Sequence, residues 1–288
     1  MAVKIQTIKD IRFYLKKKLN GIYNDPEIRV LADLLIKTIT GITKLHQLYD
    51  NGYLITDNEA NKVIQFTKEL KSGKPIQYII GETTFYNCII KVNGATLIPR
   101  PETEELVDYI IKENKDYYGN IIDLGTGSGC IAIALAANLK NSKVTGTDIS
   151  EEAIRIADEN RILNNVRVNF IIDDIFNPHP EKLKKAGIIV SNPPYIRNSE
   201  KHLMSENVLG FEPHLALFVT DSEPLVYYEA ILKLAKELLF PDGIIYFEIN
   251  EAMGLPMVKL LESFGYIKIK ITNDINDKPR ICEGRKKV

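Results

Sequence analysis

The motif from Ser191 to Tyr195 combines residue types that suit the binding of a planar amino group. The side-chain oxygen of Asn192 and the carbonyl of Pro193 can each accept one N–H, and neither proline of the motif adds a donor. Pro193 and Pro194 fix their own φ angles and restrict the residues before them, so the geometry is set before a substrate arrives. Tyr195 offers a flat face to a substrate and to a cationic group. Asn-Pro alone marks a turn, but the whole motif predicts a catalytic site that presents an NH2 group to an electrophile.

A glycine-rich segment, DLGTGSG at residues 123–129, stands where a predicted strand turns into a helix. Alternate glycines permit backbone angles closed to other residues and let a ligand approach without a Cβ in the way. Ligands of parallel α/β sheets bind at such strand ends, although a tight turn without a ligand is the alternative. The dinucleotide fingerprint is incomplete because Cys130 replaces its third small residue, and there is no GxxxxGK[ST] phosphate loop. The expected cofactor-binding residues of this loop are Gly125, Thr126, Gly127, Ser128 and Gly129.

Acidic residues follow the next two predicted strands. Asp148 stands about twenty residues after the glycines, where a carboxylate can accept hydrogen bonds from both hydroxyls of a ribose. Its alternative role is to cap the following helix, for which Ser150 is itself a sufficient N-cap. Asp174 can reach an adenine amino group while Ile175 packs against the ring, although Asp also favours turns at strand ends. Together these residues predict a ligand that carries adenosine.

The composition is that of a globular protein, with 45% hydrophobic and 26% charged residues in a chain of 288. A formal net charge of −1 provides no general positive field for nucleic acid. No apolar run approaches the roughly 20 residues that span a bilayer, and the N-terminus lacks the apolar centre of a signal peptide, so we expect a cytoplasmic protein. Its few cysteines and histidines are scattered, which predicts buried thiols and no metal site.

Changes in hydrophobic pattern divide the chain into three expected domains. Residues 1–73 show helical amphipathicity and predict a small all-α domain. Residues 74–100 contain short apolar runs and predict a β-hairpin linker. Residues 101–288 begin with a predicted helix, 102–114, and then alternate strands and helices, which indicates a mostly parallel α/β sheet with helices on both faces. Further helices are expected at 129–139, 151–163, 224–239 and 252–264.

Turn signals separate the short strands expected in the linker. The runs QYII at 77–80, TTFY at 83–86 and CIIKV at 88–92 read as strands, with Gly81 and Asn93-Gly94 as turn signals. At the other end of the chain, Arg280 to Lys286 is expected to pair as a last strand with YIKIKIT at 266–272.

Taken together, these motifs resemble those of class I S-adenosylmethionine-dependent methyltransferases, which have a Rossmann-like sheet. Over nearly its whole length the chain is similar to the protein N5-glutamine methyltransferases that act on peptide chain release factors, the HemK/PrmC family. NPPY alone also fits DNA adenine methyltransferases, but IPRPETEEL followed by a glycine loop, NPPY and FEP is much more specific. The resembling segments are PIQYIIGETTFY at 75–86, LIPRPETEELV at 97–107, DLGTGSGCIAIALA at 123–136, SNPPYI at 191–196, FEPHLAL at 211–217 and PDGIIYFEI at 241–249.

The resemblance implies transfer of a methyl group from S-adenosylmethionine, with S-adenosylhomocysteine as the product. The acceptor would be the side-chain nitrogen of a glutamine in the GGQ motif of a release factor. Residues 125–129, Asp148, Ile175 and Asn192 would line the cofactor site, and Asn192 to Tyr195 would hold the glutamine. In-line transfer requires no general base, because an N-alkylated amide can lose its proton to water. We expect a monomer whose partners are release factors, with no direct contact to nucleic acid or membrane, and whose helical domain recognises the substrate.

Some positions depart from the family pattern or allow another role. Asn250 replaces a glycine that usually follows Glu-Ile in the family, and no glutamine follows it closely. Ile175 stands where some members have an aromatic residue. Glu212 is a candidate to brace the Asn192 loop, with a purely structural role as its alternative. The alternative functions are an adenine N6-methyltransferase on DNA or RNA, which needs a basic groove that the near-neutral charge does not indicate, and a catalytically silent nucleotide-binding module.

Overall fold

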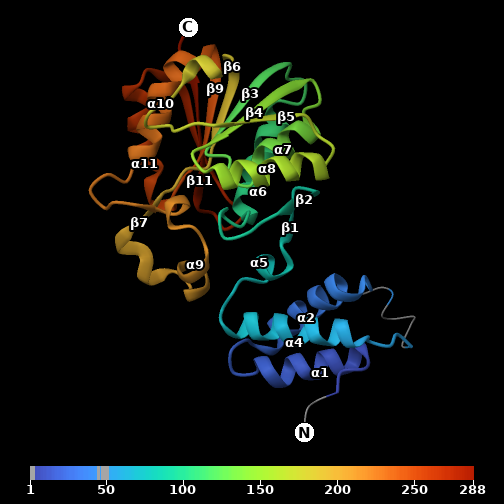
Figure 1. The fold of residues 1–288 in the computed structure, drawn as a ribbon. Helices are drawn as coiled ribbons and strands as arrows, with labels where there is room; N and C mark the ends of the chain where they lie inside the picture. The colour runs from blue at the N-terminus through green and yellow to red at the C-terminus, as the bar shows by residue number, and fades with distance from the viewer. Residues whose placement is uncertain (1–3, 44–45, 47–51) are drawn as a thin grey trace. The chain divides into compact units, whose positions relative to one another are not determined.

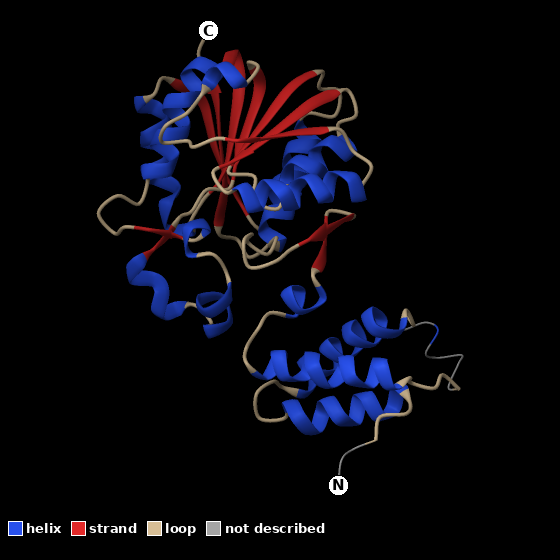
Figure 2. Cartoon of the chain, viewed as in Figure 1, coloured by secondary structure: helices blue, strands red, loops and turns tan. Residues whose placement is uncertain are grey.

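The computed structural model describes residues 4–43, 46 and 52–288, which form two compact units. One unit consists of the chain up to Gly81 together with Glu206–Phe211, and the other of Glu82–Ser205 and Glu212–Val288. Figure 1 traces the chain by residue number, and Figure 2 shows that helices build the first unit whereas strands lie in the second. No helix among the described residues combines the length and apolar character that a membrane crossing requires.

The first unit is all helical, as its amphipathic periodicity predicts. Three of its helices begin with a capping box, in which Thr7, Asn24 or Thr56 accepts a backbone N–H and an acidic residue of the first turn accepts the N–H of the cap residue. Such a reciprocal pair satisfies two backbone donors that would otherwise lack partners. Leu15 and Leu35 are fully buried in the shared core. The described helices are α1 (Ile8–Leu19), α2 (Asp25–Thr40), α4 (Asp57–Lys71), α5 (Ile76–Ile80) and α9 (Glu206–Phe211).

The strand predicted for QYII is wrong, because these residues lie in the short helix α5. Pro75 precedes the helix, and Gly81 ends it with φ at +86° while its N–H donates to the carbonyl of Gln77. Tyr78 and Ile79 are buried. A run of so few apolar residues carries no periodicity that separates a helix from a strand, so its surroundings decide the conformation.

The predicted hairpin is present, but its turn lies elsewhere. β1 (Glu82–Phe85) pairs antiparallel with β2 (Cys88–Lys91), and the two residues between them, Tyr86 and Asn87, have φ angles of 43° and 63°. Positive φ at both central residues is the geometry of a tight two-residue hairpin turn. The Tyr86 N–H donates to the Glu104 carboxylate, 18 residues away. The turn pair Tyr86-Asn87 lacks the glycine that usually marks such a hairpin, so the local sequence did not reveal it.

The second unit contains a seven-stranded sheet in the order β10-β11-β9-β6-β3-β4-β5. The five strands from β9 to β5 in that order run parallel, and β11 is antiparallel to β9 and to β10. The predicted pairing of the last strand is therefore confirmed. The strands are β3 (Gly119–Leu124), β4 (Ser142–Asp148), β5 (Val168–Ile172), β6 (Ala186–Ser191), β9 (Leu239–Glu248), β10 (Tyr266–Asn273) and β11 (Pro279–Lys286).

Helices cover both faces of this sheet, which confirms the predicted fold class. Figure 1 shows α7 and α8 on one side and α10 and α11 on the other. The rings of Tyr228 and Phe247 meet edge to face at 5.2 Å in the core between α10 and the sheet. Between β6 and α10 the chain forms a two-stranded pair, β7 (Ile196–Arg197) with β8 (Phe218–Val219). The helices of this unit are α6 (Pro101–Glu113), α7 (Cys130–Asn138), α8 (Glu151–Leu163), α10 (Val226–Leu238) and α11 (Gly254–Ser263).

Candidate active site

A cavity of about 350 Å³ lies at the carboxyl ends of β3, β4, β5 and β6. Its volume falls within the range usual for pockets that bind small molecules or cofactors. A second cavity of about 100 Å³ adjoins it and shares Asn192 and Pro193 as wall residues. The predicted site residues that line the larger cavity are Gly125, Thr126, Gly127, Ser128, Asp148, Asp174, Ile175, Asn192, Pro193 and Pro194. Of these two cavities, Tyr195 lines only the smaller one, and Gly129 lines neither.

The glycines of the loop after β3 are required for two different structural purposes. Gly125 and Gly127 have φ angles of +73° and +54°, and a Cβ on either would meet no atom within 4 Å. They line the cavity and leave its space free, which fits a ligand that lies against the backbone. A Cβ on Gly129 would instead come within 2.8 Å of the Phe170 ring. Gly129 therefore permits close packing at the start of α7 rather than contact with a ligand.

Asp148 ties the glycine loop to the end of β4. Its Oδ2 accepts the Gly127 N–H at 2.8 Å, and its Oδ1 accepts the Ser150 N–H at 2.9 Å. Burial raises the pKa of Asp148, and the backbone hydrogen bonds oppose this increase. Each carboxylate oxygen has a further lone pair, so Asp148 can bind hydroxyl groups of a ligand while it holds the loop.

At the end of β5, the chain turns around Asp174 and exposes apolar side chains to the cavity. The Asp174 carboxylate accepts the N–H of Phe176 at 2.9 Å, which is a local turn contact. The Phe176 and Tyr227 rings meet edge to face at 5.0 Å, and both rings line the cavity together with Ile149. These three apolar residues did not emerge from the sequence as site residues. Only for Phe176 did the sequence contain a signal, because it directly follows the predicted site residue Ile175.

Asn192 is held by a chain of hydrogen bonds that reaches a buried carboxylate. Its Nδ2 donates to Thr103 Oγ1 at 3.1 Å, and the Thr103 hydroxyl donates to Glu248 Oε2 at 2.7 Å. The Tyr195 hydroxyl donates to the other oxygen of Glu248 at 3.0 Å. Asn192 Oδ1 accepts no hydrogen bond from the residues that the structure describes. Thr103 and Glu248 lie within segments that resemble the family, but no sequence pattern indicates that they meet.

Glu212 braces a different loop from the one that the sequence suggested. Its carboxylate is buried, accepts the Ile98 N–H at 3.2 Å and pairs with the Arg100 guanidinium at 2.6 Å. Arg100 lines both cavities. Glu212 therefore positions the segment before α6 and not the Asn192 loop, since a sequence motif does not reveal which distant backbone its side chain meets.

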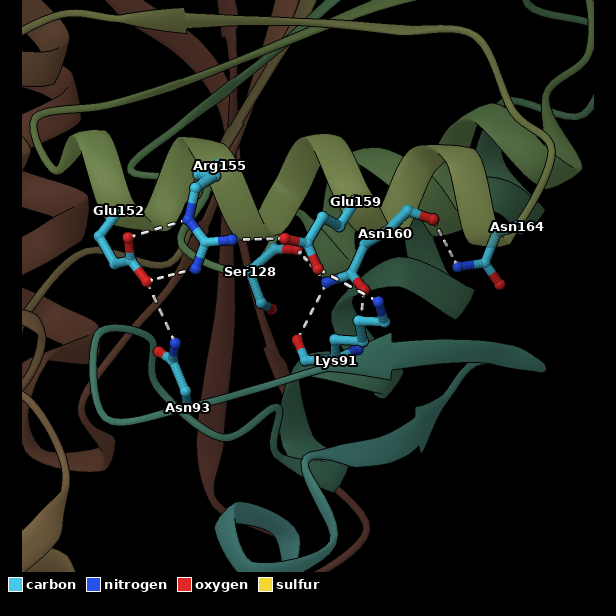
Figure 3. Close-up of polar contacts among 8 residues, drawn as sticks. All are labelled: Lys91, Asn93, Ser128, Glu152, Arg155, Glu159, Asn160 and Asn164. Atoms are coloured by element: carbon cyan, nitrogen blue, oxygen red, sulfur yellow. Dashed lines mark hydrogen bonds and ion pairs between the residues drawn. The ribbon is translucent and has the colours of Figure 1, made fainter.

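Asn160 on α8 is a further residue that the sequence did not reveal (Figure 3). It is fully buried, its Oδ1 accepts the Lys91 N–H at 2.7 Å, and its Nδ2 donates to the carbonyls of Lys91 and Ser128 at 3.0 and 2.9 Å. One turn later, Asn164 makes a similar bridge to the N–H and carbonyl of Ile89, nearer to solvent. Asn160 thus joins β2 and the glycine loop to one helix.

The strand order and a cavity formed by a glycine loop and NPPY define this protein as a methyltransferase of the α/β class. Residues 103–209 match the family model described as Methyltransferase small domain, and residues 10–81 match the PrmC N-terminal domain. A release factor glutamine methyltransferase of Flavobacterium psychrophilum is 40% identical over 96% of this chain and 98% of its own. One from Bacteroides thetaiotaomicron is 41% identical over 94% and 97%. The chain belongs to the release factor glutamine methyltransferase family.

Solved structures support the same fold. A methyltransferase from Pyrococcus furiosus superposes with a TM-score of 0.52 at 17% identity, over 81% of this chain and 100% of the other. The hMettl16 catalytic domain in complex with a 3′UTR hairpin has a TM-score of 0.53 at 17% identity, over 82% and 84% of the two chains. At such low identity these similarities concern the fold alone.

The buried bridge of Asn160 leads to a testable expectation about stability. Asn160→Ala leaves a backbone N–H and two carbonyls without their partner, so we expect a loss of about 2–4 kcal/mol in the free energy of unfolding. Asn164→Ala is the matched control, because its similar contacts are nearer to water and should be worth about 1 kcal/mol or less. Urea unfolding followed by circular dichroism measures both. Equal losses would contradict a special role for the buried bridge.

Asp123, at the end of β3, leads to an expectation about pH. Its side chain is fully buried and accepts a hydrogen bond from Thr126, and burial raises its pKa to about 7. Between its ordinary pKa and pH 7 the folded state binds more protons than the unfolded state, so wild-type stability falls as the pH rises. Asp123→Asn removes this titration. We expect the variant to gain about 1–3 kcal/mol relative to wild type between pH 5 and pH 8, measured by urea unfolding at each pH. A difference independent of pH would show that Asp123 titrates normally.

Proposed function

We propose that Asn192, Pro193, Pro194 and Tyr195 hold the side-chain amide of a release factor glutamine while a methyl group is transferred to its nitrogen. The observation that carries this proposal is the position of Asn192 and Pro193 in the wall common to both cavities. The larger cavity suits a nucleoside cofactor, and the smaller one suits a single side chain. A group held at the common wall can therefore meet a reactive atom on the other side.

The larger cavity is proposed to bind S-adenosylmethionine, which supplies an electrophilic methyl group on a positively charged sulfur. Gly125 to Ser128 would place their backbone against the ligand, and Asp148 would accept hydrogen bonds from its ribose hydroxyls. Asp174 and Ile175 would bind the adenine, together with the apolar wall described above. Half-buried Asp174 and the apolar side chains around it support this placement.

The proposed chemistry depends on the acceptors of the motif, because an amide nitrogen is a poor nucleophile. Asn192 Oδ1 and the Pro193 carbonyl would each accept one N–H of the glutamine, and Tyr195 would lie along its planar carboxamide. These acceptors stabilise the positive charge that grows on nitrogen as the N–C bond forms and the S–C bond breaks. Holding nitrogen about 3–3.5 Å from the methyl carbon, in line with sulfur, removes much of the entropic barrier. The nitrogen then releases one proton to water.

The same acceptors would also suit the exocyclic amine of a flipped-out adenine. The formal net charge of −1 provides no broad positive field for a nucleic acid, and the family relationship favours glutamine. We therefore propose a release factor as the partner, with action as a monomer in the cytoplasm and no direct contact with nucleic acid.

Two substitutions separate the proposed roles. We expect Asn192→Ala to lower kcat by about 100-fold or more with a much smaller change in cofactor affinity, because it removes an acceptor needed as charge develops. Asp148→Ala should weaken cofactor binding first. Initial rates and isothermal titration calorimetry with S-adenosylmethionine measure the two effects. Equal losses of rate and affinity in Asn192→Ala would assign that residue to the cofactor pocket, and an unchanged cofactor Kd in Asp148→Ala would remove the ribose assignment.

The choice of substrate is tested with radiolabelled S-adenosylmethionine. We expect label in a release factor and none in DNA or RNA of mixed sequence, because a formal net charge of −1 provides no broad positive field for nucleic acid. Replacing the glutamine of the release factor GGQ motif by alanine should abolish labelling. Labelling of nucleic acid would favour the adenine alternative, and labelling of neither would favour a silent binding module.

A further inference from the structure

We infer that Thr103 and the buried Glu248 are positioning residues that determine which atom of Asn192 faces the substrate. This inference rests on the proposed function, since it concerns how Asn192 comes to present an acceptor. Thr103 lies in the first turn of α6 and Glu248 at the end of β9, 145 residues apart in the chain, and their side chains meet at 2.7 Å.

The direction of each hydrogen bond determines how the Asn192 amide is turned. A carboxylate only accepts, so the single hydroxyl proton of Thr103 is donated to Glu248. Thr103 Oγ1 then has only lone pairs left for Asn192, and the atom of Asn192 that can meet a lone pair is Nδ2. Because the amide is planar, fixing Nδ2 at Thr103 turns Oδ1 away from it. The flipped amide would point its own N–H groups at the NH2 group of the substrate.

Glu248 is held as a hydrogen-bond acceptor on both of its oxygens. The Tyr195 hydroxyl occupies Oε1, so both polar side chains of the NPPY motif depend on this carboxylate, Asn192 through Thr103 and Tyr195 directly. Burial raises the pKa of Glu248, whereas the two hydroxyl donors and the positive charge of Arg280 favour its ionised form. Arg280 is itself fixed by Asp274 at 3.1 Å.

A buried carboxylate is a costly way to stabilise a core, since apolar residues of similar volume often serve as well. Glu248 is 1% exposed, borders the smaller cavity and accepts a hydrogen bond from Tyr195 of the motif. An apolar side chain at this position could not accept the hydrogen bonds of Thr103 and Tyr195, and so could not fix their direction. This directional role explains why a carboxylate occupies the position.

The test compares Thr103→Val, which keeps the shape and removes the hydroxyl, with Thr103→Ser, which restores it. We expect Thr103→Val to lower kcat by about 10- to 100-fold, with the KM for the release factor and the Kd for S-adenosylmethionine within about two-fold of wild type. Thr103→Ser should recover most of the lost rate. Thr67→Val is the matched control, because Thr67 is a buried threonine of α4 whose hydroxyl bonds to a carbonyl of its own helix. Its kcat should stay near that of wild type.

Glu248→Gln provides an independent arm at nearly constant volume. The new amide oxygen can still accept from the Tyr195 hydroxyl, which places the new NH2 group against Thr103. Thr103 then accepts from that NH2 group and donates to Asn192, which reverses the Asn192 amide. We expect a fall in kcat at least as large as that of Thr103→Val, and a double variant that loses less than the product of the two single losses, because both changes act through Asn192.

The outcomes distinguish this inference from the proposed function. If Asn192→Ala lowers kcat while Thr103→Val behaves like Thr67→Val, the positioning role is overturned and the proposed function stands. A loss in Thr103→Val that Thr103→Ser does not recover would assign the effect to packing and would also overturn it. An unchanged rate in Asn192→Ala would overturn the proposed function itself.

Discussion

The position of β3, between β4 on one side and β6 on the other, is the constraint on which the rest of the structure depends. From β3 the order of parallel strands continues through β4 and β5 in one direction and through β6 and β9 in the other. Loops that leave neighbouring strands in opposite directions open a crevice at their carboxyl ends. The glycine loop follows β3 and the NPPY motif follows β6, so the fold brings together two motifs that lie more than sixty residues apart in the chain.

Buried and partly buried polar side chains then fix each loop around that crevice. Asp148 and Asn160 hold the glycine loop, Glu212 holds the segment that contains Arg100, and Glu248 holds the NPPY motif through two hydroxyl groups. Burying such groups is costly unless they are hydrogen-bonded, and each of these four makes at least two such contacts. The cavity is thus formed by loops whose conformations are set before any ligand binds.

Sequence patterns predicted the parts of this structure that local physical chemistry controls. The helix expected at 151–163 is α8 without change of bounds, because Ser150 caps it and its periodicity is clear. QYII was misread, since so short an apolar run fits a helix or a strand equally. The contacts of Glu212 with Ile98 and Arg100, and that of Glu248 with Thr103, were not predicted for another reason. In each case the partner lies more than one hundred residues away in the chain. The sequence predicted which residue types gather at the cavity but not how they bond to one another.

The common wall between the two cavities has a consequence for the design of inhibitors. Asn192 and Pro193 border both spaces, so under the proposed assignment a compound that fills only one cavity would compete with only one of the two reactants. Under the proposed assignment, a compound that joins a nucleoside to a carboxamide would place its linker at the wall that both cavities share. Such a compound would combine the affinities of both halves.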